Sequence, residues 1–287
     1  MAADFAPSTM RLALLSPIHG QSIEHIARQL ENYRVFLAPF ELRHYFHVSL
    51  ESHPDLQSEL TAFAEQEGHS IVFTKRRQPT WRPCTAYALC ELIKTALADD
   101  HIHDKVLIHT DTDLLVSTKA KDQLENYRIG CGSRTFRYDK TSPWRWTAAA
   151  IADPRLKRFT SEMLDGDISK LRIGRVCGAY MPWSVFKTFG VTYNYFFKDD
   201  YFKRKPNRIW PLAEIAIPSI LHLLEDSDTS FQPPLIKVPK NKTLPCKSID
   251  RMIERGENFG LKKIARDTDS EAFHYVMRLQ AHTARGT

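Results

Sequence analysis

The chain has few of the features that mark membrane, secreted or disulfide-bonded proteins. No apolar run approaches the roughly 20 residues needed to cross a bilayer, and no basic segment followed by an apolar core opens the sequence. The 5 cysteines are scattered, odd in number and without a CxxC pair, so neither a disulfide framework nor a zinc knuckle is indicated. These absences predict a cytoplasmic protein with reduced thiols.

Several motifs of nucleotide-binding and hydrolytic enzymes are also missing. The 11 glycines form no GxGxxG and no P-loop, no GxSxG is present, and the 12 histidines form no HExxH. Dehydrogenase, kinase and hydrolase functions are therefore disfavoured. With 43% hydrophobic and 26% charged residues, and no internal repeat or Gly/Ser linker, the 287 residues have the composition of one ordinary globular chain.

Positive charge is concentrated near the C-terminus. The formal net charge is +6, and residues 237–287 hold 11 Lys/Arg against 6 Asp/Glu. Such a surface could meet anionic lipid, an acidic saccharide, a nucleotide diphosphate or nucleic acid, and charge alone does not choose among them. We predict a catalytic domain over residues 1–236 and a basic, partly mobile extension over residues 237–287. This extension would dock the protein on an anionic acceptor or peripherally on the inner face of a membrane.

The first 116 residues alternate predicted strands with predicted helices. Short runs rich in apolar and β-branched residues predict strands, and amphipathic stretches between them predict helices. In chain order these are strand 11–16, helix 22–35, strand 44–50, helix 54–67, strand 70–74, helix 85–98 and strand 105–110. This alternation predicts an α/β fold with a doubly wound, mainly parallel sheet and helices on both faces.

The second half of the chain has a less regular pattern. It predicts helix 118–126, strand 128–131, strand 171–180, a short helix 184–188 stopped by Gly190, and an apolar helix 214–224. Pro218 is compatible with the last helix if that helix begins near Glu214, because a proline in the first turn removes no internal hydrogen bond.

Ligands of doubly wound sheets bind beyond the carboxyl ends of the strands. The residues that directly follow predicted strands include Pro17 and His19, then Lys75, Arg76 and Arg77, and finally Asp111 to Asp113. The three basic residues, with Arg82 before the next helix, have the charge to hold a diphosphate. A solvated basic loop is the competing interpretation.

The strongest motif is HTDTD at residues 109–113. Two carboxylates one residue apart can share a hard cation, and Mn²⁺ or Mg²⁺ prefers oxygen ligands completed by water and substrate phosphates. We predict that Asp111 and Asp113 are metal ligands on the protein surface, with His222, His274 and His282 as candidates for a further ligand. A turn or helix cap built from aspartates is the structural alternative.

The segment ALCELIKTALADDHIHDKVLIHTDTDLLV, residues 88–116, resembles the GT-A glycosyltransferases, in which a helix precedes a strand that ends in a DxD motif. The resemblance implies a GT-A-like domain, with residues 10–116 as the nucleotide-binding half and 117–236 as the acceptor half. By that resemblance Asp111 approaches the donor ribose or the metal, and Asp113 binds the metal that bridges the diphosphate. The implied donor is a UDP- or GDP-sugar.

A second segment, GAYMPWSVFKTFG at residues 178–190, is similar to the small-residue turn, short helix and glycine of many GT-A enzymes. This similarity places the sugar and acceptor pocket near Gly178, Ala179 and Tyr180. The implied reaction is sugar transfer to a saccharide or lipid-linked saccharide in surface glycan synthesis.

Two acidic positions are candidates for the catalytic carboxylate. Glu214, at the start of an apolar helix, is favoured as the acceptor-activating base of an inverting transfer, because an isolated carboxylate among apolar residues is readily made basic. Asp200, in the acidic pair of FFKDDYF, is second. A carboxylate at Glu214 that merely complements the helix dipole is the structural alternative.

Two functions of other classes remain open at this stage. The basic tail and the aromatics Tyr193, Tyr195 and Phe196 suit a nucleic-acid-binding or metal-dependent nucleotide-processing protein, although no motif for it is present, so nucleic acid is disfavoured. An inactive GT-A-like scaffold that binds a saccharide or a partner is the other.

Overall fold

The computed structural model describes residues 9–81, 84–137, 139, 141–225, 231–239, 244–264 and 267–286. Its centre is a seven-stranded sheet in the order β10-β6-β9-β4-β1-β2-β3. Strand β9 is antiparallel to β4 and to β6, and the other neighbours are parallel. The predicted doubly wound, mainly parallel sheet is therefore confirmed. The strands are β1 (Arg11–Ile18), β2 (Glu41–Val48), β3 (Ser70–Phe73), β4 (Lys105–Ile108), β6 (Ile129–Gly130), β9 (Ala179–Pro182) and β10 (Phe231–Gln232).

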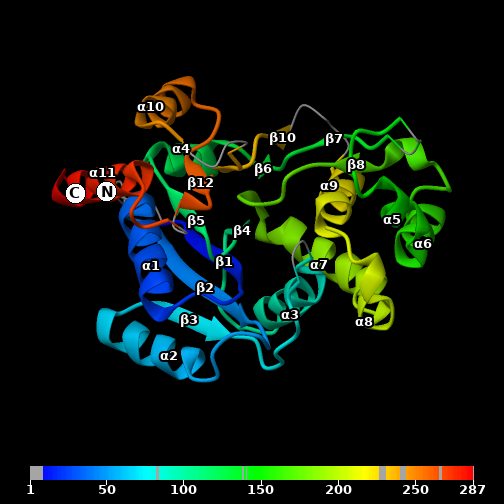
Figure 1. The fold of residues 1–287 in the computed structure, drawn as a ribbon, viewed down its shortest axis with the longest axis horizontal. Coiled ribbons are helices and arrows are strands. Elements are labelled where there is room, and N and C mark those ends of the chain that lie inside the picture. The colour runs from blue at the N-terminus through cyan, green and yellow to red at the C-terminus, as the bar shows by residue number, and fades with distance from the viewer. Residues whose placement is uncertain are drawn as a thin grey trace, which may run out of the picture.

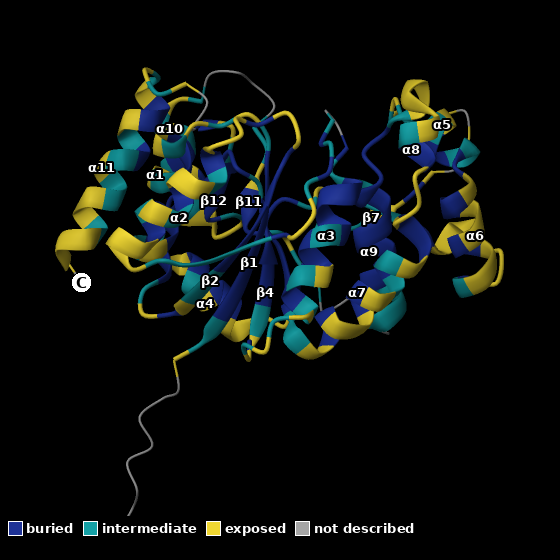
Figure 2. Ribbon diagram, turned by 90° about the horizontal axis from the view of Figure 1, so that it is seen from below, coloured by how far each residue is buried: buried dark blue, intermediate teal, exposed yellow. Residues whose placement is uncertain are grey.

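Helices cover both faces of this sheet (Figure 1). Alternate residues of β1 show why: Leu12 and Leu14 pack in one apolar core, while Ala13 and Leu15 pack in another. Figure 2 shows the strands buried between the two layers. The first layer holds α1 (Ile23–Leu37), α2 (Leu56–Glu67) and α4 (Lys119–Asn126), and the second holds α3 (Ala86–Leu97), α7 (Trp183–Phe197) and α9 (Ala213–Leu224).

Smaller elements complete the described chain. They are α5 (Thr147–Ala152), α6 (Pro154–Met163) and α8 (Tyr201–Arg204), with β7 (Arg134–Thr135) paired to β8 (Arg172–Ile173). Among the described residues no helix is both long and apolar enough to cross a bilayer.

The C-terminal residues build a second, three-stranded sheet in the order β11-β12-β5. It joins β5 (Asp113–Leu115), from the DTDLL segment, to β11 (Ile236–Lys237) and β12 (Gly260–Lys262). Leu114 and Val116 share a core with Met252 of α10 (Cys246–Arg255) and with Phe273 and Val276 of α11 (Glu271–Gly286), at the upper left of Figure 1. The boundary drawn at 236/237 thus falls inside β11, and the described C-terminal residues pack on the DxD strand instead of forming a separate extension.

Helix α7 corrects one sequence prediction. It runs over 15 residues and passes through Gly190, where a short helix was expected to stop. The reason is a close helix–helix approach: a Cβ at Gly190 would lie 2.7 Å from Ile93 Cγ2 on α3. Gly190 therefore allows close packing of α7 against α3 and is not a helix C-cap.

The single strand predicted over residues 171–180 is also wrong, because the chain forms β8 and β9 with a turn between them. Gly174 sits against the backbone of Gly132, where a Cβ would fall 1.5 Å from a carbonyl oxygen. Gly178 has φ +79°, a left-handed conformation that favours glycine. These two glycines break the apolar run.

Candidate functional site

The turn after β4 is closed by the Asp113 side chain. Thr110 donates its backbone N–H to Asp113 Oδ2 at 2.8 Å and its hydroxyl to Oδ1 at 2.9 Å. The side chain is 0% exposed. Asp113 was expected to be a surface carboxylate that contributes little to the core, and this expectation is wrong. The carboxylate is a buried, hydrogen-bonded part of the turn.

The charge that faces Asp113 comes from β12. Because Lys262 is the register partner of Asp113, its Nζ lies 3.5 Å from Asp113 Oδ1. The same ammonium donates to Thr110 Oγ1 at 2.5 Å and to Cys177 Sγ at 3.2 Å. Burial opposes the charge of Lys262, but Asp113 holds its pKa above the ordinary value, so the lysine is cationic. Its side chain is 17% exposed, so Lys262 is partly open to solvent while the Asp113 side chain is not.

Asp111 joins this turn to the loop after β1. Its Oδ2 accepts the backbone N–H of His19 at 2.8 Å, and the His19 ring Nδ1 lies 2.8 Å from Thr80 Oγ1. Asp111 is 6% exposed. The strand-end argument therefore placed His19 and Asp111 correctly at one edge of the sheet. Pro17 lies within β1 itself, where it pairs with His47.

Helix α1 holds the backbone of the DxD turn with three buried polar side chains that the sequence analysis missed. His25 Nε2 lies 2.7 Å from Asp111 O, and Gln29 Nε2 donates to Thr110 O at 2.8 Å and to Asp113 O at 2.6 Å. Asn32 accepts from Leu115 N at 2.7 Å and donates to Leu115 O at 3.0 Å. The available signal was the i, i+4, i+7 spacing of polar residues on a helix face that should be apolar.

Glu214 lies in the first turn of α9 and is not isolated. Its Oε1 pairs with Arg175 Nη1 at 2.5 Å, and the Glu214 side chain is 16% exposed. Burial raises the pKa of the Cys177 thiol, Lys262 acts against that, and the negative charges of Asp113 and Glu214 add to it. Arg175, which pairs with Glu214, and Cys177, which accepts a hydrogen bond from Lys262, lie two residues apart in the chain, so the turn between β8 and β9 links Glu214 to Lys262.

Pro218 leaves the backbone carbonyl of Glu214 without a hydrogen-bond donor inside helix α9. Helix α9 begins at Ala213, close to the expected start, but Pro218 is its sixth residue and therefore lies beyond the first turn. Pro218 has no N–H for the carbonyl of Glu214, four residues earlier. That carbonyl instead accepts the N–H of Gly174 at 2.9 Å. This hydrogen bond from Gly174 connects the start of α9 to the turn between β8 and β9, which carries Arg175.

The remaining predicted residues fall into two groups. Gly178 and Ala179 lie beside the DxD turn, since Gly178 N donates to Ile108 O at 2.7 Å and Ala179 pairs with Ile108 at the end of β4. Asp200 precedes α8, pairs with Lys203 at 3.2 Å and has a 63% exposed side chain. Helix α8 lies well apart from β12 in both Figure 1 and Figure 2.

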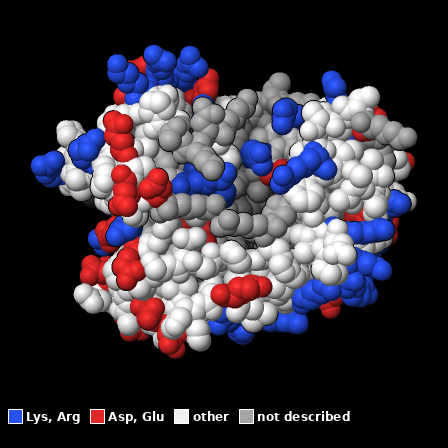
Figure 3. Space-filling model, viewed as in Figure 1, with Lys and Arg blue, Asp and Glu red and all other residues white. Residues whose placement is uncertain are grey.

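The basic residues after β3 differ among themselves. Arg77 Nη2 donates to the carbonyls of Ser49 and Ser52 at 2.5 and 3.1 Å, so its guanidinium joins two loops. Lys75 and Arg76 are exposed. Arg82 lies outside the described residues. Figure 3 shows further Lys and Arg side chains in the middle of the drawn face, between the places of β12 and β8.

Asp113 is not placed to bind a Mn²⁺ or Mg²⁺ ion. Both Asp113 oxygens accept hydrogen bonds, its side chain has no exposed surface, and an ammonium already faces it. In the described part of the chain no three His, Cys, Asp or Glu side chains gather as a metal site. His222 instead stacks on Phe231, with ring centroids 4.1 Å apart.

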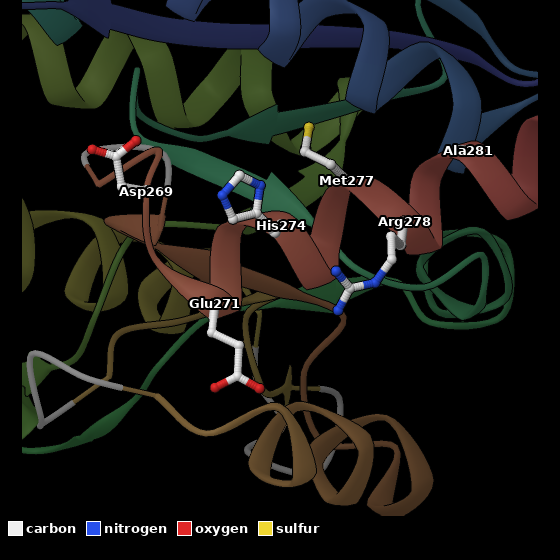
Figure 4. Close-up of a pocket in the computed structure, with 6 residues that line it drawn as sticks. All are labelled: Asp269, Glu271, His274, Met277, Arg278 and Ala281. Atoms are coloured by element: carbon white, nitrogen blue, oxygen red, sulfur yellow. The ribbon is translucent and has the colours of Figure 1, made fainter.

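Neither the α11 pocket nor the aromatic residues favour another kind of site. A pocket of about 650 Å³ is lined only by residues of α11 and the turn before it (Figure 4), with none of the DxD residues. Tyr193 and Phe196 are buried at 0% and 4% exposure, so of the three aromatics considered for base stacking only Tyr195 is exposed.

Strand order, the DxD turn and the antiparallel β9 define the chain as an α/β protein of the GT-A-like fold. The solved structure of galactosyltransferase LgtC with donor and acceptor sugar analogues matches 95% of this chain and 96% of its own, at 12% identity and a TM-score of 0.51. An active-site mutant of LgtC matches over the same shares at 12% identity and a TM-score of 0.48. No protein-family model and no curated protein matches the chain.

Proposed function

We propose that the chain transfers a sugar from a UDP- or GDP-sugar to a hydroxyl of a saccharide or lipid-linked saccharide. The observation that supports this most is the DxD turn at the carboxyl end of β4, beside a partly exposed Lys262, in a GT-A-like fold. LgtC, which has a similar fold, was solved in complex with donor and acceptor sugar analogues. Residues 10–116 are the donor side in this proposal, and residues 117–236 are the acceptor side.

A panel of UDP- and GDP-sugars tests the donor. A true donor should raise the melting temperature and release its nucleoside diphosphate slowly by hydrolysis, because binding to the native state alone stabilises it. Free sugars serve as the control. Stabilisation by oligonucleotides with a steep salt dependence, and by none of the sugar nucleotides, would contradict the proposal.

We assign the chemical step to Glu214. In an inverting transfer it deprotonates the acceptor hydroxyl, and in a retaining transfer it stands on the opposite face of the donor sugar. The anomeric configuration of the product distinguishes the two roles. Its ion pair with Arg175 and the hydrogen bond from Gly174 to its carbonyl hold Glu214 against the turn between β8 and β9, whose Cys177 accepts a hydrogen bond from Lys262.

Glu214→Gln removes the charge and keeps the shape, so kcat should fall by roughly 10² or more while donor affinity changes little. Glu225→Gln is the matched control: Glu225 follows α9, pairs with Arg128 at 2.8 Å, and has a 15% exposed side chain against 16% for Glu214. Equal kcat in both variants, with loss in Asp200→Asn, would move the catalytic role to Asp200.

A further inference from the structure

We infer that the ammonium of Lys262, in place of a divalent cation, binds the diphosphate of the donor, and that Asp113 positions this lysine. The inference rests on the proposed function, because it concerns the phosphates of a nucleotide-sugar donor. It also reverses the sequence-based expectation for the DxD motif, in which Asp113 was a metal ligand.

Asp113 presents no exposed oxygen to a metal ion. Mg²⁺ and related ions keep several water or phosphate ligands around them, so a coordinating carboxylate must present an oxygen to a solvated space. Asp113 has a 0% exposed side chain, and Thr110 already occupies both of its oxygens. Because the side chain is buried, a hydrated ion would reach Asp113 only if the turn opened.

The positive charge of Lys262 also opposes a metal ion at Asp113. A metal bound to Asp113 Oδ1 would lie about 2 Å from that oxygen. Lys262 Nζ lies 3.5 Å from the same atom. The two cations would then be at most about 6 Å apart in a partly buried site, where like charges repel strongly. A single lysine neutralises Asp113 without that repulsion.

The Lys262 ammonium has a hydrogen-bond donor left for a ligand. Lysine has three N–H donors. Two of them meet Thr110 Oγ1 and Cys177 Sγ, and the ion pair with Asp113 is 3.5 Å long, beyond an ordinary hydrogen bond. A phosphate oxygen that reaches the 17% exposed Lys262 side chain can accept a hydrogen bond from the remaining N–H of the ammonium. The compact ammonium suits a phosphate as a point charge.

Calorimetric titration with UDP and GDP tests this first on the wild-type protein, in excess EDTA and in excess Mn²⁺. We expect the same affinity in both conditions. Binding seen only with Mn²⁺ would overturn the lysine inference and leave the proposed function standing. Binding of neither nucleotide in either condition would overturn both.

Variants then test the residue. Lys262→Met should weaken binding of the nucleotide by about 10- to 100-fold, the loss of one charge-assisted hydrogen bond. Lys263→Met is the matched control, because Lys263 is the next residue, is exposed, and contacts the turn through its backbone N–H to Thr112 O at 2.8 Å. Its affinity should stay at the wild-type value.

Removing Lys262 alone leaves Asp113 buried without its partner and could unfold the chain. The double variant Asp113→Asn, Lys262→Met removes both charges together and keeps similar shapes. A double variant with a wild-type melting transition and a 10- to 100-fold weaker nucleotide affinity would support the inference. A folded double variant with wild-type affinity would overturn it.

Discussion

Asn32 is expected to be among the most sensitive positions for stability, although it touches no predicted ligand. Strand β5 is the edge of the small sheet, with β12 on one side only. On its other side, Leu115 has a backbone N–H and a backbone C=O that both bond to the Asn32 side chain, at 2.7 and 3.0 Å. Asn32 thus takes the place of a neighbouring strand.

The magnitude follows from these two bonds. Asn32→Ala leaves two backbone groups without a partner at Leu115, which is 0% exposed. An unsatisfied buried polar group costs about 1–3 kcal/mol, so the two cost about 2–6 kcal/mol. Alanine returns at most about 0.7 kcal/mol through its higher helix propensity. The net loss of about 1–5 kcal/mol is large against a total stability of about 5–15 kcal/mol.

Urea unfolding with linear extrapolation measures the change, and an unchanged m value would show that the unfolded state is the same. Asn126→Ala, at the exposed end of α4, is the matched control for helix propensity. The reasoning is refuted if Asn32→Ala is no less stable than Asn126→Ala. A folded Asn32→Ala protein should also bind UDP or GDP more weakly, since β5 begins with Asp113.

Three further predictions concern pH, packing and the C-terminus. Burial lowers the pKa of His47 to about 4, and its Nε2 accepts the Gln78 N–H at 2.9 Å, so the folded state holds the neutral ring. The neutral ring should therefore stabilise the folded state above the ordinary histidine pKa of about 6.5, and this stabilisation should be lost as the pH falls toward 4. Between about pH 7 and about pH 5 the wild-type protein should lose about 2 kcal/mol of stability. The His47→Gln variant should lose less over the same range. Gly190→Ala should lower stability by about 1 kcal/mol or more, because crowding against Ile93 outweighs the gain in helix propensity, and a higher melting temperature than wild type would contradict this. Deleting residues 237–287 removes β12 and α11 and exposes Leu114 and Val116, so cooperative unfolding monitored by circular dichroism should be abolished. A truncated protein that folds stably and shows only a raised acceptor KM would instead support the docking extension.

The sequence by itself determined the order of the elements and the place of the DxD motif. Apolar periodicity is local, so the four strands and three helices between residues 11 and 108 were predicted to within a few residues of their observed ends. Strand β5, which begins at Asp113, was not predicted. The carboxyl ends of parallel strands share an edge, and this rule alone brought His19 and Asp111 together. The motif's carboxylates were found for the same reason, because they follow directly after an apolar run.

Only the tertiary structure decided what those carboxylates do. The pairing of β12 with β5 sets Lys262 against Asp113, and residues so far apart in the chain carry no local signal of that contact. The same holds for Gly190, whose helix continues because α3 packs against it, and for Asn32, which serves as a strand's partner. In each case the side chain's role depends on the neighbour that folding supplies, since burial and opposing charge are properties of the packed site and not of the residue type.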